Sequence, residues 1–240
     1  MKKFNLLFVT LCICGIQVFS QDAKLTEDWT KKPVIVTPGC HQSPPSDAII
    51  LFQKAKDIAN WEGRGGPAKW KASFKKMQVN GTGDIVTKEK FGDCQLHVEF
   101  RTPSKVKGDG QGRGNSGVYI QSQYEVQVLD SYINETYYNG QAGAVYKQSA
   151  PLVNASRKPG KWQAYDIVFH APRFAADGSL TKPASVTVLH NGVLIQDHYE
   201  LTGPTTYAGA PKYTAHGDMP LLLQDHGNPV CYRNVWIRKL

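Results

Sequence analysis

Short apolar segments rich in Val, Ile, Phe and Tyr, separated by turn-forming residues, are the feature that most restricts the fold of this chain. Its 240 residues include 22 Gly and 14 Pro, and periods typical of amphipathic helices are scarce. A hydrophobic content of 41% can close a sizeable core. The sequence therefore predicts one all-β domain, an antiparallel β-sandwich of two sheets. The expected strands cover residues 95–101, 117–121, 124–129, 162–170, 185–189, 193–196 and 230–238.

The dipeptide Asn191-Gly192 supports the clearest local prediction. Both central residues of a type I′ turn need positive φ, which Asn and Gly tolerate best. We therefore expect a β-hairpin in which two valines of the first strand pair with two apolar residues of the second: Val186 and Val188 with Val193 and Ile195.

The first twenty residues have the pattern of a secretory signal peptide. Lys2 and Lys3 precede an almost unbroken apolar run over residues 4–18, and Ser20 provides a small residue for cleavage. The run is shorter than the roughly 20 apolar residues of a membrane span. We therefore expect an exported protein, periplasmic or secreted, with no stable membrane span and with a mature chain that begins near Gln21.

Residues 21–47 contain four prolines but little periodicity, which predicts an irregular N-terminal arm laid on the domain. No internal repeat is evident in the remaining sequence. Residues 48–240 are therefore expected to form a single domain.

Three cysteines, Cys40, Cys94 and Cys231, follow the expected cleavage point. Their wide spacing excludes CxxC-type zinc and redox motifs, and an odd number allows at most one disulfide, whose pairing stays open. A buried thiol is the alternative for each. Cys12 and Cys14 belong to the signal segment, where the preceding residues lack the small-residue pattern of a lipoprotein cleavage site.

The mature chain is moderately basic. The 28 basic residues become 26 without Lys2 and Lys3, and these exceed the 20 acidic residues by 6. The basic residues are scattered or in short groups, without a basic helix or interleaved aromatic residues, so nucleic-acid binding is not expected.

Polar side chains alternate with apolar ones on the expected strands. Three apolar residues alternate with His97, Glu99 and Arg101 on one strand, and Tyr119 and Gln121 face away from the apolar side chains on another. A polar, aromatic sheet face is typical of sugar recognition, because hydroxyl-rich ligands need convergent hydrogen bonds and an aromatic plane. Simple solvent exposure is the alternative for each residue taken alone.

The strand from Glu125 to Asp130 is chemically the most informative. Strict alternation separates Glu125 from Asp130, but a bulge at residues 128–129 would return Asp130 to the Glu125 face. The pattern resembles the E-x-D-x-x-E strand of concanavalin-like glycoside hydrolases, which aims two carboxylates into a sugar cleft. Gln127 and the shorter Asp130 depart from that pattern. The alternative is that Asp130 caps the turn at residues 131–132.

Several other site classes have little support. Residues 108–114 are rich in Gly but lack the Gly-Lys-Ser/Thr ending of a phosphate loop, which favours a mobile loop beside the cleft. No HExxH, HxH or Gly-x-Ser-x-Gly pattern occurs, so a zinc site is weakly supported and a serine-hydrolase site is not.

His226 is a candidate acid, base or ligand, with a structural histidine as the alternative. Oxygen-rich loops such as that of Asp109 leave room for a divalent metal such as calcium, but the sequence specifies no cofactor.

Four segments in the same order resemble a known family: residues 83–88 with 91–100, 115–119 with 124–130, 159–162 with 165–169, and 223–230 with 233–237. They are similar to the 3-keto-disaccharide hydrolase domain, also described as a 3-keto-glucoside 1,2-lyase domain, over most of the mature chain. Lys161 and Gln163 depart from the family's segment around Trp162. The resemblance implies a concanavalin A-like jelly roll, with residues 48–240 as the catalytic domain, and a 3-keto-glucoside or 3-keto-disaccharide as the partner.

The resemblance also implies a reaction. A ketone at C3 of a glucoside acidifies the C2 proton, so a base can form an enolate, β-elimination can expel the C1 substituent, and hydration can complete a net hydrolysis. We expect Glu125 or His226 as the base and Asp130 at the leaving oxygen, with an electrophile at the enolate: Arg233, Gln224 or a bound metal. The residues expected to line the sugar cleft are Glu99, Arg101, Asn115, Tyr119, Gln121 and Gln127.

Two other functions fit the same polar face. A lectin-like carbohydrate-binding module would bind sugar without turnover, and an ordinary glucanase would use Glu125 and Asp130 on unoxidised glycans. The replacement of the middle acid by Gln127 argues against the glucanase. The aglycone, the anomer, the oligomeric state and the choice between lyase and net hydrolase stay open.

Overall fold

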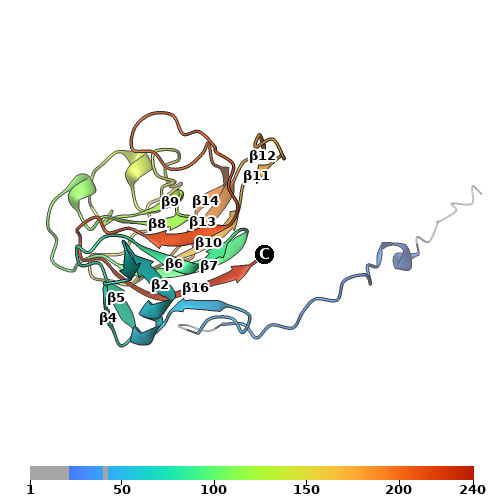
Figure 1. The fold of residues 1–240 in the computed structure, drawn as a ribbon, viewed down its shortest axis with the longest axis horizontal. Helices are drawn as coiled ribbons and strands as arrows, with labels where there is room; N and C mark the ends of the chain where they lie inside the picture. Colours follow the sequence, from blue (N-terminus) through green and yellow to red (C-terminus); the bar gives the residue numbers. More distant parts are fainter. Residues whose placement is uncertain (1–21, 40–42) are drawn as a thin grey trace, which may run out of the picture. The chain divides into compact units, whose positions relative to one another are not determined.

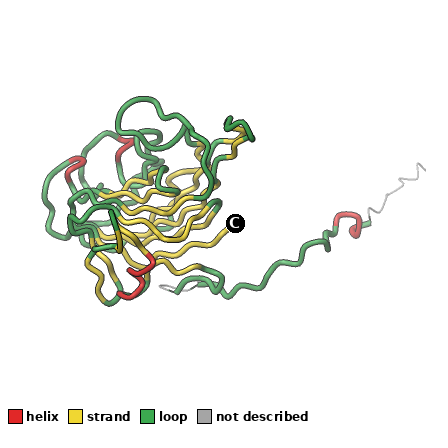
Figure 2. Tube along the Cα trace, in the orientation of Figure 1, coloured by secondary structure: helices red, strands yellow, loops and turns green. Residues whose placement is uncertain are grey.

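Two antiparallel sheets packed face to face form the body of the unit that follows residue 35, in a computed structural model that describes residues 22–39 and 43–240 (Figure 1). The expected all-β jelly roll of two sheets is therefore confirmed. Figure 2 shows that strands and loops dominate this unit and that helix is limited to short turns. The strands are β1 (Ile49–Phe52), β2 (Trp61–Gly63), β3 (Gly66–Pro67), β4 (Lys71–Ser73), β5 (Lys76–Gln78), β6 (Ile85–Phe91), β7 (Cys94–Arg101), β8 (Ser116–Ile120), β9 (Tyr124–Val128), β10 (Gln163–His170), β11 (Arg173–Phe174), β12 (Leu180–Lys182), β13 (Ser185–His190), β14 (Val193–Glu200), β15 (Met219–Leu223) and β16 (Cys231–Lys239). The 3-10 helices are η1 (Ala23–Thr26), η2 (Ala55–Asn60), η3 (Gly110–Gly112) and η4 (Tyr138–Gly140).

The strand order brings distant parts of the sequence together. The larger sheet runs β14-β13-β10-β7-β16-β5-β4, with β1 paired to β16, and the smaller sheet runs β3-β2-β6-β15-β8-β9. β11 and β12 form a separate two-stranded ribbon. The late strand β15 thus lies beside β8 (Figure 1), which places the residues after β15 next to the β8–β9 hairpin.

Apolar side chains from both sheets meet in one core. On β9, Tyr124 and Val126 belong to this core, and the Tyr124 ring centroid lies 5.6 Å from that of Phe169 on β10. The Tyr165 hydroxyl of β10 donates a hydrogen bond to the backbone carbonyl of Gln127 at 2.8 Å. Because side chains alternate along a strand, the odd-numbered residues of β9 face away from the core.

β13 and β14 form the expected hairpin. The Asn191-Gly192 dipeptide has φ values of 54° and 82°, as a type I′ turn requires. The turn places His190 opposite Val193. The expected pairing of the two valines is wrong, because the turn sets a different register and a register shift moves Val188 opposite Gln196.

Several sequence-based expectations concern residues near the N-terminus. The expected signal peptide (residues 1–20) and Cys40 lie outside the described residues, whereas Cys94 and Cys231 are buried free thiols. Within residues 22–39 the only regular element is η1, and the arm over residues 21–47 stays a prediction. Across the described part of the chain, no helix is long and apolar enough to cross a membrane.

Candidate active site

A cavity of about 480 Å³ lies where β8, β9 and the end of β15 meet three loops. It opens on the outer face of the smaller sheet, since the β9 residues that line it alternate with core residues. Six of the residues expected from the sequence line it: Asn115, Tyr119, Glu125, Gln127, Gln224 and His226.

The β8–β9 hairpin positions the carboxylate of this cavity. Its pairing is regular and places Tyr119 opposite Glu125 and Gly117 opposite Gln127. On the other side of β9, the backbone N–H of Tyr146 donates to the Glu125 carbonyl at 3.2 Å. Glu125 therefore lies between two tyrosines from neighbouring segments.

Glu125 is nearly removed from water. Only 3% of the residue is exposed. Burial raises the pKa of Glu125 to about 8, although a hydrogen bond with Tyr119 acts in the opposite direction. Burial, followed by the nearby charge of Glu125, also raises the pKa of Tyr119. A carboxyl group tuned in this way can accept a proton near neutral pH far better than an ordinary glutamate.

Gly117 leaves the space that this carboxylate occupies. A Cβ atom at Gly117 would lie 2.5 Å from Oε1 of Glu125 and 2.6 Å from the Tyr119 ring. Real Cβ atoms do not approach other atoms so closely, so a side chain here would displace one or both groups. Gly117 is thus a site residue that sequence reasoning did not select, because a glycine within a strand has no chemical signature of its own.

Amide side chains line the cavity beside Glu125. Nε2 of Gln127 donates to Oε1 of Gln111 at 2.9 Å, and Nδ2 of Asn115 donates to the Gln111 backbone carbonyl at 2.8 Å. Oε1 of Gln127 is buried and has no hydrogen-bond partner among the described residues.

The segment after β15 supplies Gln224 and His226. The backbone N–H of Gln224 donates to the Gly117 carbonyl at 3.0 Å, and its side-chain Nε2 donates to the Tyr119 hydroxyl at 3.3 Å. Asp225 points elsewhere, because its Oδ2 accepts from the backbone N–H of Gly83 at 3.1 Å. The neighbouring His226 lines the cavity.

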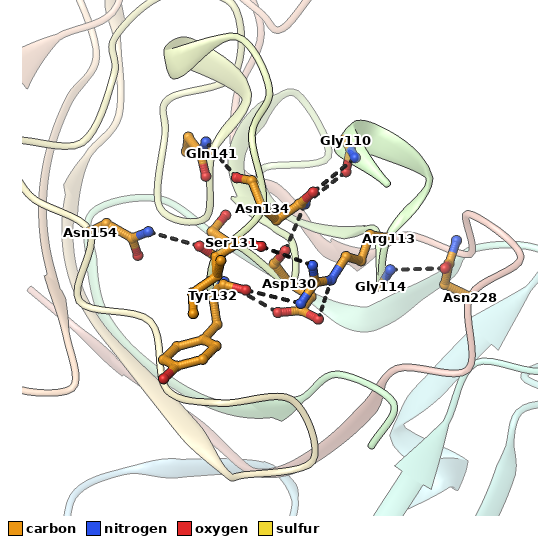
Figure 3. Close-up of polar contacts among 11 residues, drawn as sticks. Gly110, Arg113, Gly114, Asp130, Ser131, Tyr132, Asn134, Gln141, Asn154 and Asn228 are labelled. Atoms are coloured by element: carbon orange, nitrogen blue, oxygen red, sulfur yellow. Dashed lines mark hydrogen bonds and ion pairs between the residues drawn. The ribbon is translucent and has the colours of Figure 1, made fainter. Parts of the chain in front are cut away.

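Asp130 lies outside this cavity, which corrects the expected grouping with Glu125. The β8–β9 pairing contains no register shift, so the expected bulge does not form there, and β9 ends at Val128. Nε of Arg113 donates to Oδ2 of Asp130 at 2.7 Å, and the backbone N–H of Tyr132 donates to Oδ1 at 3.2 Å. Figure 3 shows these contacts together with those of Arg113 to the backbone of the following turn. Asp130 thus caps the turn, as the alternative interpretation predicts.

Glu99, Arg101 and Arg233 also lie away from the cavity. They belong to β7 and β16 of the larger sheet, where the alternate residues of β7 fill the core. Glu99 accepts hydrogen bonds from Nε of Arg233 at 2.6 Å and from Nδ2 of Asn234 at 2.9 Å. The expectation that they line the same cleft as Glu125 is corrected, because the outer faces of two packed sheets point in opposite directions.

His97 belongs to the same outer face as Glu99. Its Nδ1 lies 2.7 Å from Oδ1 of Asp166. Burial opposes the charged form of His97, but interactions with Asp166 and Glu99 outweigh it and raise the pKa of His97 to about 9. These charges are engaged with one another on the outer face of the larger sheet.

Gln121 is also removed from the cavity. It lies in the β8–β9 turn, is 2% exposed, and donates from Nε2 to the backbone carbonyl of Phe91 at 2.9 Å. Its expected role in lining the cleft is corrected for this reason.

Gln111 and Gly112 belong to the loop of residues 108–114 that the sequence predicts beside the cleft, and both line the cavity. The structure adds four loop residues that sequence reasoning did not select: Tyr137, Tyr146, Thr205 and Tyr207. Within the described ranges, no group of three or more His, Cys, Asp or Glu side chains is arranged to hold a metal ion.

Comparisons with known proteins identify the family and the fold of the chain. A family model described as a 3-keto-alpha-glucoside-1,2-lyase-like domain matches residues 47–238. The crystal structure of a candidate glycosyl hydrolase from Parabacteroides distasonis is 46% identical, with a TM-score of 0.87, and the match covers 91% of this chain and 97% of that chain. A second such structure from the same organism is 20% identical, with a TM-score of 0.58 and coverage of 81% and 94%, and shows a shared fold. None of the curated proteins matches the chain.

Proposed function

Because this chain belongs to the 3-keto-alpha-glucoside-1,2-lyase-like domain family, we propose that it cleaves 3-keto-glucosides by removing the C2 proton and eliminating the C1 substituent. The observation that carries this proposal is the lining of the cavity. Among the described residues, Glu125 is the one carboxylate that lines it. A two-carboxylate glycosidase needs a second acid on the other side of the scissile bond, whereas an elimination needs one base.

Glu125 is assigned as the base. Its carboxylate takes the C2 proton, and the electron pair of the C2–H bond forms an enolate with the C3 ketone. The enolate then re-forms the ketone, the C1=C2 double bond forms, and the C1–O bond breaks. The product is a 2-hydroxyglucal with a ketone at C3, and water can add across its double bond to give 3-keto-glucose.

The other polar groups of the cavity support the two charged oxygens of this reaction. The Gln224 amide donates one hydrogen to the Tyr119 hydroxyl at 3.3 Å, and its second N–H is assigned to the enolate oxygen as a hydrogen-bond donor. The Tyr119 hydroxyl, with its single hydrogen, is assigned to orient the Glu125 carboxylate. His226 lines the same cavity and is assigned to protonate the leaving oxygen. These roles replace the expected roles of Asp130 and Arg233, which lie elsewhere.

The test is turnover of defined sugars by the mature protein, followed by mass spectrometry. Substrates are 3-keto-trehalose and a methyl 3-keto-glucoside beside their unoxidised parents, each with and without a chelator. We expect loss of the keto-sugars alone, with the 2-hydroxyglucal or 3-keto-glucose as product, and the chelator arm shows whether a metal contributes. Saturable binding without turnover would identify a lectin-like module, and cleavage of the unoxidised parents would identify an ordinary glycosidase.

Substitution of Gly117 by Ala tests the placement of the base. The backbone of Gly117 does not have positive φ, so Ala is sterically acceptable to the main chain, but its Cβ would displace the Glu125 carboxylate or the Tyr119 ring. We expect kcat on a 3-keto-glucoside to fall by about 10- to 100-fold, with a small change in the melting temperature. An unchanged kcat would show that catalysis does not depend on the space that Gly117 leaves for the Glu125 carboxylate.

Export remains part of the proposal. It is motivated by the signal-peptide pattern of residues 1–20. N-terminal sequencing of the protein from its native host should give a chain that begins near Gln21, and a chain that retains residues 1–20 in the cytoplasm would contradict export.

A further inference from the structure

A second cavity, of about 290 Å³, lies on the outer face of the larger sheet, where β7, β16 and β5 are neighbours. It shares no lining residue with the Glu125 cavity. Three cations line it, Lys76, Arg101 and Lys105, and none of the described residues that line it is an aspartate or a glutamate. Its charge and its position therefore set it apart from the candidate active site.

The strand pairing places the side chains of this cavity in one row. Cys231 of β16 lies opposite Arg101 of β7 on one side and opposite Gln78 of β5 on the other, and paired residues share a face of the sheet. Lys76 is two residues from Gln78 and shares that face. The sheet, rather than a loop, thus sets the positions of Arg101 and Lys76.

Arg101 lies at the centre of this row and has no acidic partner. Its guanidinium carbon lies 4.8 Å from the ring centroid of Trp162, and its Nη2 lies 3.9 Å from Sγ of Cys231, a weak acceptor. In the described part of the chain, no carboxylate forms an ion pair with Arg101. On the same face, Nε of Arg233 lies 2.6 Å from Oε2 of Glu99. Arg101 is partly buried, so the protein holds a guanidinium charge there without a counter-charge of its own.

The loop after β7 forms one wall of the cavity and is held in place by a neighbouring turn. The backbone N–H of Gly160 donates to the Thr102 carbonyl at 3.1 Å. Gly160 has a φ of 77°, and a Cβ atom there would lie 2.6 Å from Cβ of Ser104. The close approach of these two segments fixes the loop that carries Lys105.

We propose that this cavity binds an oxyanion, the sulfate, phosphate or carboxylate group of a small ligand. The proposal is independent of the reaction assigned to Glu125. The planar fork of a guanidinium matches two oxygens of such a group, and the contact with Trp162 helps to keep the Arg101 fork in one orientation. Lys76 and Lys105 add positive charge on either side. A neutral ligand would leave the partly buried charge of Arg101 without a partner, whereas an oxyanion supplies one.

A chemical-shift titration of the full mature protein tests this site. Sodium sulfate, inorganic phosphate and glucuronate are added separately in a Tris chloride buffer, with glucose as the neutral counterpart of glucuronate. We expect at least one anion to shift the backbone N–H signals of Arg101 and Gly160 saturably, with a Kd on the order of 1 mM, and glucose to leave them in place. The anion that binds most tightly identifies the group. No saturable shift of these signals with any of the three anions, or equal shifts with glucose, would overturn the proposal.

Substitutions separate a specific site from general attraction to a basic protein. Arg101→Ala should raise the Kd of the bound anion about tenfold. The matched control is Arg64→Ala, which should leave the Kd unchanged, because Arg64 is exposed between β2 and β3 of the smaller sheet and does not line the cavity. Lys76→Ala keeps the contact of Arg101 with Trp162 and should raise the Kd about two- to fivefold. A parental Kd in Arg101→Ala, or in Lys76→Ala should Arg101→Ala fail to fold, would overturn the proposal.

Discussion

Replacing Glu125 by Gln should lower kcat on 3-keto-glucosides by about 10²- to 10⁴-fold, the usual contribution of a general base. The amide keeps the size of the side chain but cannot take the C2 proton. Parental activity should depend on the ionisation of Glu125. Since burial raises its pKa to about 8, kcat/KM should rise with pH through neutrality and level off above about 8.

The same substitution should change the pH dependence of stability. Between the ordinary value of 4.5 and about 8, the native protein keeps a proton on Glu125 that the unfolded chain has lost. The free energy of unfolding of the parental protein should therefore fall as pH rises over this interval. Glu125→Gln removes this penalty, so at pH 9 the variant should be more stable than the parent by on the order of 5 kcal/mol, and near pH 4 the two should be similar.

The control is Glu99→Gln, the same chemical change in a carboxylate on the outer face of the other sheet. It should leave kcat near the parental value, as measured with the same substrates. Near-parental activity of Glu125→Gln would remove Glu125 from the mechanism. Equal stability of Glu125→Gln and the parent at pH 9, measured by denaturant unfolding, would show that this carboxyl group ionises without penalty.

Replacing Arg113 by Ala should destabilise the protein by about 3–5 kcal/mol, because it leaves a buried charge without its partner. The side chains of Asp130 and Arg113 are 3% and 14% exposed, and their contact is 2.7 Å long. Arg113 also donates to the backbone carbonyls of Tyr132 and Ile133 at 2.9 and 3.1 Å. Loss of the guanidinium therefore affects both the carboxylate and the turn that it caps (Figure 3). Denaturant unfolding at pH 7 measures the effect.

An exposed ion pair provides the comparison. Nζ of Lys239 lies 2.8 Å from Oε1 of Glu89, and the two side chains are 57% and 43% exposed. Lys239→Ala should therefore lower the free energy of unfolding by less than about 1 kcal/mol. If Arg113→Ala lowers the free energy of unfolding by no more than Lys239→Ala does, Asp130 is not a buried structural anion. A role for Asp130 in catalysis would then have to be considered again.

Alternation along the strands made much of the fold predictable. The expected strand at residues 95–101 corresponds to β7 (Cys94–Arg101), and the expected strand at 162–170 corresponds to β10 (Gln163–His170). Both keep an apolar face toward the core over their full length, which is the condition under which a period of two is informative. The pairing partners in the β13–β14 hairpin were not predictable in the same way, because the register shifts between Val186 and Leu189 cannot be read from the order of these residues.

The candidate site was predictable where it is built on strands. Tyr119 and Glu125 share the outer face of one hairpin, as alternation predicts. Alternation alone could not assign Glu99 to the other sheet, because it separates the two faces of a strand and does not identify the sheet to which the strand belongs. Tyr146 and Tyr207 come from loops, and loops have no periodic pattern to reveal which side chains converge.

The most direct test of the proposed reaction is the position of solvent hydrogen in the product. The mature protein cleaves a 3-keto-glucoside in D2O, and the products are then returned to H2O so that their hydroxyl groups exchange back. Mass spectrometry and NMR locate the deuterium that remains on carbon. An enzyme-free sample of 3-keto-glucose is the control for spontaneous exchange. The proposed elimination predicts the 2-hydroxyglucal, or 3-keto-glucose that carries one deuterium at C2, because the C2 proton leaves to Glu125 and solvent supplies its replacement. Free 3-keto-glucose with its original hydrogen at C2 would show direct displacement at C1 and would contradict the assignment of Glu125 as the C2 base.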